Sequence, residues 1–254
     1  MPLTAIVTGA ASGIGEEACR DLLAKGWTVF GIDISAEALS QHSGNAAGGS
    51  FHAFPCDIRD ADAVAATFAA ISAQTSQVNA VVASAGVVRI GSLAEMAISD
   101  FDDVFSINVR GLWLTCRHAY PLLRAAAASG ELARTVLLSS ISAIRPKIES
   151  GAYSASKAAV SQLTQVLAVE WAGDGILVNA LAPGTVDTPM IRNQSDPAKQ
   201  GNWRPSGNSP LGRVAEARDV VKAMRFLLSE DADYVTGTII PVDGGTRAAY
   251  IPPR

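Results

Sequence analysis

A tyrosine and a lysine lie four residues apart in the stretch GAYSASKAAV, residues 151–160. Apolar residues at helical spacing follow, so we predict a helix that places Tyr153 and Lys157 on one face. A phenol with its ordinary pKa of about 10 is a poor base at neutral pH. A cation about 4 Å away can stabilise the phenolate by roughly 4 kcal/mol and lower that pKa to about 7. The pair is therefore a candidate acid–base site, although the same spacing occurs in solvated surface helices.

A glycine-rich segment, TGAASGIG at residues 8–15, follows one predicted strand and opens a predicted helix. Gly9, Gly13 and Gly15 would let the backbone turn tightly and approach a pyrophosphate closely. The amides and dipole of the helix N-terminus would then stabilise the phosphate charge. We predict a dinucleotide-binding loop here, with a plain turn as the alternative.

An aspartate, Asp33, ends the second predicted strand, where a carboxylate would accept hydrogen bonds from an adenosine ribose. A carboxylate there also repels the 2′-phosphate of NADP. No Arg or Lys flanks Asp33, and Ser12 in the glycine loop is neutral, so NAD is favoured over NADP. The alternative is that Asp33 only ends its strand or caps the next helix.

Short apolar runs rich in β-branched residues alternate with longer Ala-rich segments, and this alternation predicts the elements that position these groups. The runs cover residues 3–8, 27–33, 50–57, 79–84, 135–140, 176–183 and 236–245. Between them, apolar residues recur at helical spacing, as at Val64, Phe68 and Ile71. The predicted fold class is α/β: a single-domain, Rossmann-like, doubly wound parallel sheet of about seven strands with helices on both faces. Ligand sites in such a sheet lie at the carboxyl ends of the strands.

Composition excludes several classes of protein. The 254 residues, 48% hydrophobic and 17% charged, fit one domain over residues 1–254. A net charge of −4 without a basic block makes nucleic acid and anionic membranes unexpected partners. Neither a transmembrane run nor a signal-peptide pattern is found, so we expect a cytoplasmic protein with small-molecule partners. Cys19, Cys56 and Cys116 are isolated and the histidines are unclustered, so we predict buried or unreactive thiols and no metal site.

The longest predicted loop is rich in Pro, Gly, Asn and Ser, and we assign residues 189–212 to substrate binding. Met190, Ile191 and Trp203 would supply apolar walls there. Arg145 and Lys147 are candidates to attract an anionic substrate at the mouth, or else are solvated surface residues.

The motifs together resemble the classical short-chain dehydrogenase/reductase family over essentially the whole chain. The shared motifs, in the family's order, are the glycine loop, CDI at residues 56–58, the Asn of INVRG, the Ser ahead of YSASK, PG with its following Thr, and VDGG. One departure is ASAG at residues 83–86, where the family usually has NNAG. Backbone contacts to the cofactor are still expected there, whereas a side-chain tie between neighbouring strands is expected to be lost.

The resemblance implies roles for individual residues. Tyr153 would be the acid/base, and Lys157 would lower its pKa and bond the nicotinamide ribose. Ser140 would hold the substrate oxygen, although Ser139 and Ser142 are also candidates from spacing alone. Asn108 would fix a water that links Lys157 to solvent. Besides Tyr153 and Lys157, the expected cofactor contacts are Gly9, Ser12, Gly13, Ile14, Gly15, Asp33, Asp57 (to the adenine amine), Ile58, Ser84, Ala85, Gly86, and Val186 and Thr188 (to the carboxamide).

We therefore expect an NAD-dependent oxidoreductase that interconverts a secondary alcohol and a ketone by hydride transfer. The resemblance also implies a homotetramer, with a homodimer as the alternative. One alternative function is an NADPH-dependent 3-oxoacyl-[acyl-carrier-protein] reductase, against which Asp33 argues. Another is a non-catalytic NAD-binding protein with a regulatory or association role, against which the intact set Asn108, Ser140, Tyr153 and Lys157 argues.

Overall fold

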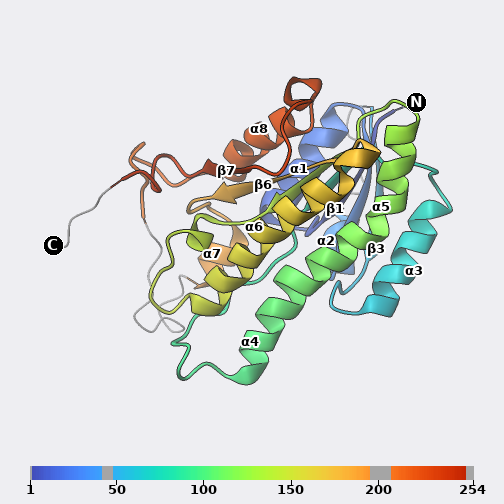
Figure 1. Cartoon of the computed structure of the whole chain (residues 1–254). Helices are drawn as coiled ribbons and strands as arrows, with labels where there is room; N and C mark the ends of the chain where they lie inside the picture. The colour runs from blue at the N-terminus through green and yellow to red at the C-terminus, as the bar shows by residue number, and fades with distance from the viewer. Residues whose placement is uncertain (1, 42–47, 195–206, 250–254) are drawn as a thin grey trace.

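Seven parallel strands form one sheet, and each lies within or across one of the apolar runs (Figure 1). The computed structural model describes residues 2–41, 48–194 and 207–249. The strands are β1 (Thr4–Thr8), β2 (Thr28–Asp33), β3 (Ser50–Pro55), β4 (Ala80–Ala83), β5 (Arg134–Leu138), β6 (Leu177–Pro183) and β7 (Ile239–Val242). Their order across the sheet is β3-β2-β1-β4-β5-β6-β7, which confirms the predicted class.

Helices cover both faces of this sheet and create two hydrophobic cores. One core lies under α1 (Gly13–Ala24), α2 (Ala36–Ser40) and α8 (Ala217–Leu227). The other lies under α3 (Ala61–Ser72), α5 (Leu112–Ala128) and α6 (Gly151–Trp171). Because both faces are covered, every residue of β1 and β4 is buried, which explains why these strands have no polar alternation.

The order of the strands places a crevice beside β1. The chain runs from β1 through β2 to β3 in one direction, and β4 then adds to the opposite edge of β1. The connections from β1 and β4 therefore leave toward opposite faces, which opens a space beyond their carboxyl ends. Gly9 and Ser84 follow directly after these two strands.

A wide helical turn interrupts the long helix before β5. Residues Ile98–Phe105 (α4) and α5 are joined by a π-helical turn, η1 (Ser106–Gly111), which carries Asn108. A π-turn adds a residue to the helical turn and is common at functional sites.

The segment assigned to substrate binding begins with a short helix, α7 (Pro189–Gln194). Before it, Val186 forms an isolated parallel bridge with Ala215, which fixes both ends of the segment beside each other. Residues 195–206, including Trp203, lie outside the described residues. Three short 3₁₀ turns, η2 (Ile141–Ala143), η3 (Ala172–Asp174) and η4 (Glu230–Ala232), complete the described elements.

Candidate active site

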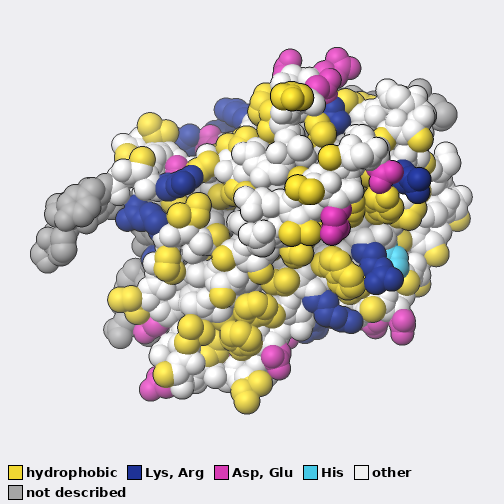
Figure 2. All heavy atoms as spheres, viewed as in Figure 1, with side chains coloured by type: hydrophobic (Ala, Val, Ile, Leu, Met, Phe, Trp, Pro, Cys, Tyr) yellow, Lys and Arg dark blue, Asp and Glu magenta, His cyan; other side chains and the backbone are white. Residues whose placement is uncertain are grey.

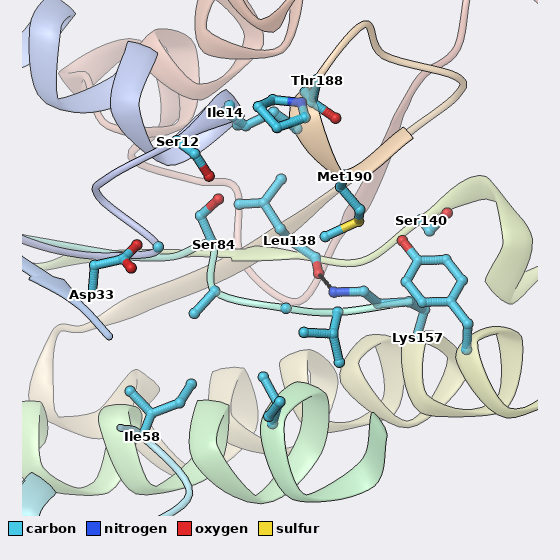
Figure 3. Close-up of a pocket in the computed structure, with 18 of the residues that line it drawn as sticks. Ser12, Ile14, Asp33, Ile58, Ser84, Leu138, Ser140, Lys157, Thr188 and Met190 are labelled. Carbon is cyan, nitrogen blue, oxygen red and sulfur yellow. Dashed lines mark hydrogen bonds between the residues drawn. The ribbon is translucent and has the colours of Figure 1, made fainter. Parts of the chain in front are cut away.

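A cavity of about 470 Å³ lies beyond the carboxyl ends of the strands. Figure 3 shows Ser12, Ile14 and Thr188 toward one side of it and Ser140 and Lys157 toward the other. All the expected cofactor and catalytic residues line this cavity except Gly15 and Asn108, which lie behind its wall. The fold thus brings together residues that lie between positions 9 and 191 of the chain.

Two glycines in the loop after β1 are required by close backbone contacts. Gly9 has φ +68°, and a Cβ there would lie 2.9 Å from the Cα of Ala85. A Cβ on Gly15 would overlap the carbonyl oxygen of Gly9. Ser12, at the N-cap of α1, makes no capping hydrogen bond with its side chain. The helix N-terminus therefore faces the cavity with its first amides and a hydroxyl available to a phosphate, so this cradle fits a dinucleotide.

Asp33 is held against the glycine loop by two backbone amides. Its Oδ2 accepts from the N–H of Ala11 at 3.1 Å, and its Oδ1 accepts from the N–H of Ser35 at 3.0 Å. The neighbouring Ile34 is exposed and apolar, so it offers no charge to a phosphate. The carboxylate thus lies beside the loop in a fixed position where ribose hydroxyls could donate to it.

The ASAG segment retains a tie between β1 and β4 without the family's asparagines. The Thr8 Oγ1 at the end of β1 accepts from the N–H of Ala85 at 3.3 Å. Gly86 lies close beneath the active-site groups, since a Cβ there would be 3.1 Å from Asn108 Oδ1 and 3.4 Å from Lys157 Nζ. The asparagine side chains expected to be lost are absent, and Thr8 of the adjoining strand supplies a side-chain hydrogen bond to this segment.

The catalytic candidates converge where β5 ends and α6 begins. The hydroxyl of Ser140 lies close enough to the phenol of Tyr153 to act on its pKa. Lys157 Nζ donates to the Leu138 carbonyl at 2.8 Å, drawn as the dashed line in Figure 3, and lies 5.7 Å from the centre of the Tyr153 ring. The arrangement places a hydroxyl, a phenol and an amine at one end of the cavity.

The pKa values of this pair are dominated by burial. Burial raises the pKa of the Tyr153 phenol, and the hydrogen bond from Ser140 only partly opposes this. Burial also lowers the pKa of Lys157 to about 8. The expectation that Lys157 brings the pKa of Tyr153 below its ordinary value does not hold in this structure. The physical reason is that the ammonium lies over the ring and bonds Leu138, so desolvation of the phenolate prevails.

Ser140, among the three serines that spacing leaves open, is the one that contacts Tyr153. The Ser139 hydroxyl instead donates to the Lys157 carbonyl at 3.0 Å and pairs with the Ser161 hydroxyl, so it fastens β5 to α6. Ser142 uses its backbone N–H to donate to Ser140 Oγ at 3.1 Å. That bond orients the Ser140 hydroxyl toward the phenol.

Asn108 is fully buried and its amide is bonded to the protein. Its Nδ2 donates to the Val87 carbonyl at 2.9 Å and to Ser156 Oγ at 3.0 Å, while its Oδ1 accepts from the Val87 N–H at 2.8 Å. The Ser156 hydroxyl in turn donates to the Tyr153 carbonyl at 2.7 Å. Both amide hydrogens are thus in use, so any water held by this side chain would have to donate to Oδ1.

Val186 and Thr188 lie beside the glycine loop. A Cβ on Gly13 would meet the Thr188 methyl group at 3.3 Å, and both residues line the cavity. Arg145 donates to the carbonyls of Thr246 and Ala249, so this guanidinium holds the C-terminal segment and does not point freely to the mouth. Its expected role in attracting an anionic substrate is therefore not supported.

The three cysteines are buried free thiols, as predicted. Burial raises the pKa of Cys116 to about 12, and it also raises the pKa of Cys19 and of Cys56. A thiol with a raised pKa is a poor nucleophile. The described residues contain no helix that is long and apolar enough to cross a membrane.

Comparison with known proteins identifies the family. The family model described as enoyl-(acyl carrier protein) reductase matches residues 9–247. A galactitol 2-dehydrogenase (L-tagatose-forming) of Cereibacter sphaeroides is 38% identical over 95% of this chain and 93% of its own. The chain belongs to the short-chain dehydrogenase/reductase family. As a short-chain dehydrogenase/reductase it is an oxidoreductase that binds a nicotinamide dinucleotide, NAD or NADP, and interconverts an alcohol and a ketone.

Other short-chain dehydrogenases and reductases are similar over their whole length. A cis-4-hydroxycyclohexanecarboxylate dehydrogenase of Sinomonas cyclohexanicum is 36% identical, with 96% of each chain covered. Among solved structures, levodione reductase has a TM-score of 0.86 at 29% identity and 98% coverage of both chains. A 3-ketoacyl-(acyl-carrier-protein) reductase of Brucella melitensis, complexed with NADH, has a TM-score of 0.87 at 28% identity, covering 96% of this chain and 98% of its own.

Sequence reasoning missed several residues of this site. Ser156 and Thr8 looked like ordinary small polar residues, and only their partners in space give them roles as ties. Arg59, which follows the CDI motif, lines the cavity and bonds Asp57. An arginine two residues after an expected ligand-binding aspartate is a signal that could have been noticed.

Proposed function

We propose that this chain is an NAD-dependent secondary-alcohol dehydrogenase/ketone reductase in which Tyr153 is the general acid/base. The observation that carries the proposal is that Ser140, Tyr153 and the buried Lys157 line the same cavity as the glycine cradle and Asp33. A phosphate cradle at one end and a proton donor at the other are what hydride transfer to or from a carbonyl carbon requires.

In the oxidation direction, the Tyr153 phenolate accepts the substrate hydroxyl proton while Ser140 donates to the oxygen that becomes the carbonyl. In reduction, the Tyr153 hydroxyl gives its proton to that oxygen. The bound nicotinamide dinucleotide supplies the hydride acceptor or donor. Burial lowers the pKa of Lys157 to about 8, so its amine can take up or release a proton near neutral pH. It can therefore exchange protons when Tyr153 returns to its starting protonation state. Asn108 positions Tyr153 through Ser156, whose hydroxyl donates to the Tyr153 carbonyl.

The preference for NAD rests on Asp33 and on the charges around it. The basic residues among the described lining residues are Arg59, Arg89 and Lys157. Arg59 and Arg89 each pair with carboxylates, and Lys157 lies at the other end with Leu138. A 2′-phosphate would therefore meet the Asp33 carboxylate without a free cation to neutralise it.

The direct test is a panel of secondary alcohols and ketones with NAD(H), followed by the absorbance of the reduced cofactor. With a competent substrate, Tyr153→Phe should slow single-turnover hydride transfer by about 10²- to 10⁴-fold, the range that general acid–base catalysis contributes. Near wild-type rates in Tyr153→Phe would refute the assignment. Tight NAD binding without turnover of any alcohol would favour a regulatory or association role.

We also propose that the chain assembles as a homotetramer, in which the face formed by α5 and α6 is one contact. Figure 2 shows hydrophobic side chains gathered over this region. Among them, Val169 on α6 is 80% exposed and Trp113 on α5 is 38% exposed, and an apolar groove runs between Phe105, Trp113 and Leu163. An exposed apolar patch of this kind is typical of a protein interface.

A further inference from the structure

Arg59 connects the cavity wall to two carboxylates. Its Nε donates to Asp57 Oδ2 at 2.9 Å, and its Nη2 donates to the same oxygen at 2.7 Å. Its Nη1 donates to Asp103 Oδ1 at 2.9 Å. Asp57 belongs to the loop after β3 and Asp103 to α4, so one guanidinium joins two elements that are distant in sequence.

The contact with Arg59 fixes both the charge and the orientation of Asp57. Arg59 also donates to Asp57 Oδ1, through its backbone N–H at 2.9 Å and through Nε at 3.1 Å. These bonds hold the pKa of Asp57 below its ordinary value. Asp57 is therefore an ionised acceptor with its oxygens in a fixed plane. The three hydrogens that Arg59 donates leave one of the carboxylate's roughly four acceptor sites for another donor.

Arg59 is itself fixed by contacts on its other side. Asp103 Oδ2 also accepts from Arg89 Nη2 at 3.3 Å, and Arg89 follows β4. The carbonyl of Arg59 accepts from Arg110 in the π-turn, and a Cβ on Gly111 would lie 2.7 Å from Ile58. The loop that carries Asp57 is therefore packed against the same turn that carries Asn108.

The ion pairs of Arg59 are expected to add little to the stability of the fold. The side chain of Arg59 is 40% exposed, and exposed ion pairs contribute about 0–1 kcal/mol to folding. Asp57, Ile58, Arg59 and Asp103 all line the cavity. Three charged side chains that bond each other on a ligand-facing wall suggest a role in how the ligand is held.

We propose that Arg59, anchored by Asp103, is a positioning residue that presents the Asp57 carboxylate to the amine of the cofactor's adenine. This inference rests on the proposed function and on the family resemblance, which implies that Asp57 faces that amine. Without the guanidinium, Asp57 could rotate and would lose its fixed plane, so the charge-assisted bond to the amine would weaken. Arg59 thus contributes to recognition of the base, and Asp33 to recognition of the ribose.

The test compares NAD+ with nicotinamide hypoxanthine dinucleotide, in which an oxygen replaces the adenine amine and the nicotinamide half is identical. Wild type should prefer NAD+, because the carbonyl oxygen of hypoxanthine cannot donate to Asp57. In Arg59→Ala, the KM for NAD+ should rise about 5- to 20-fold with kcat little changed, as expected for loss of one charge-assisted hydrogen bond. The KM for the hypoxanthine analogue should change much less, so the preference for NAD+ shrinks.

A second variant and a control complete the design. Asp103→Asn keeps the shape of the anchor but removes its charge, and should shrink the same preference by a smaller factor. Arg124→Ala removes the guanidinium of another ion pair, with Asp174, outside the cavity, and should leave the preference unchanged. Equal weakening of both dinucleotides in Arg59→Ala, or no preference in wild type, would overturn the inference. Failure of wild type to bind NAD+ would overturn the proposed function itself.

Discussion

Burial governs the individual catalytic groups, and Lys157 shows this most clearly. The lysine is buried in the cavity wall and bonds the Leu138 carbonyl, so its charge has lost most of its hydration. A pKa lowered to about 8 means that the charged form is destabilised in the folded protein at neutral pH. This destabilisation of the ammonium suits a site that needs an amine able to release a proton near neutral pH.

The lowered pKa predicts a pH-dependent contribution to stability. Between about pH 8 and pH 10.5 the unfolded chain binds more protons at Lys157 than the folded chain, so this group increases stability as pH rises through that window. Lys157→Met removes the titrating group. Urea unfolding at pH 7.5 and at pH 10 should therefore show wild type gaining stability relative to the variant by up to about 3 kcal/mol. A pH-independent difference between the two proteins would contradict the burial argument.

A second single residue, Asp33, is expected to set the preference between NAD+ and NADP+. In Asp33→Ala the repulsion of a 2′-phosphate is removed together with the acceptor for the ribose hydroxyls. We expect the kcat/KM ratio of NAD+ to NADP+ to fall by about tenfold or more, mainly through weaker use of NAD+. Steady-state kinetics with both cofactors measure this. Glu37→Ala removes a carboxylate in the following helix and should leave the ratio near that of wild type.

At the level of elements, the π-turn that carries Asn108 organises the active site. It places one amide between the Val87 backbone and Ser156, and Ser156 holds the first turn of α6 where Tyr153 lies. Three elements therefore meet at one buried side chain. An ordinary α-helical turn would point the Asn108 side chain in another direction, so the wider turn allows its amide to reach Val87 and Ser156.

Asn108→Ala should therefore be costly in two ways. It removes three buried hydrogen bonds, with an expected loss of about 3 kcal/mol in the free energy of unfolding. It should also reduce kcat, because α6 is no longer tied near Tyr153. Ser156→Ala is the matched control, since it removes only one of these bonds from Asn108, and it should lose about 1 kcal/mol. Equal effects of both substitutions in chemical denaturation would refute this account.

The sequence predicted the elements better than their junctions. The strands were recognisable because β-branched residues buried on both faces leave continuous apolar runs, as in β1 and β4. The π-turn was not, because SINVRG keeps ordinary helical spacing. Arg59 and Asp103 are 44 positions apart, so their pairing cannot be predicted from the sequence around either residue. The choice of Ser140 over Ser139 likewise depended on where each hydroxyl points, because that of Ser139 bonds the Lys157 carbonyl and Ser161 whereas that of Ser140 acts on the Tyr153 phenol.

At the scale of the whole molecule, the parallel sheet places the chemistry and the proposed assembly contact on separate surfaces. The cavity opens beyond the carboxyl ends of the strands, whereas the exposed apolar side chains lie along the outer sides of α5 and α6. These helices also carry the groups that tie the active site, so subunit association would stiffen it from outside.

A charge on that surface tests the proposed assembly. Val169→Asp should shift the protein to a smaller species in sedimentation velocity at micromolar concentration, because a carboxylate would be buried at the contact. Thermal unfolding monitored at the same concentrations reports whether the separated subunits remain folded. Ala70→Asp, on the exposed side of α3, is the control and should leave the sedimentation coefficient unchanged. An unaltered coefficient for Val169→Asp would exclude this face as the contact.

The grip of Arg145 on Thr246 and Ala249 has a practical consequence for handling the protein. Arg145 follows Ser140 by five residues. An affinity tag fused to the C-terminus would therefore disturb a segment that is hydrogen-bonded close to the catalytic hydroxyl. A tag before β1 would instead leave from the amino ends of the strands, at the side of the sheet opposite the cavity. Kinetic work on this enzyme should therefore use an N-terminal tag.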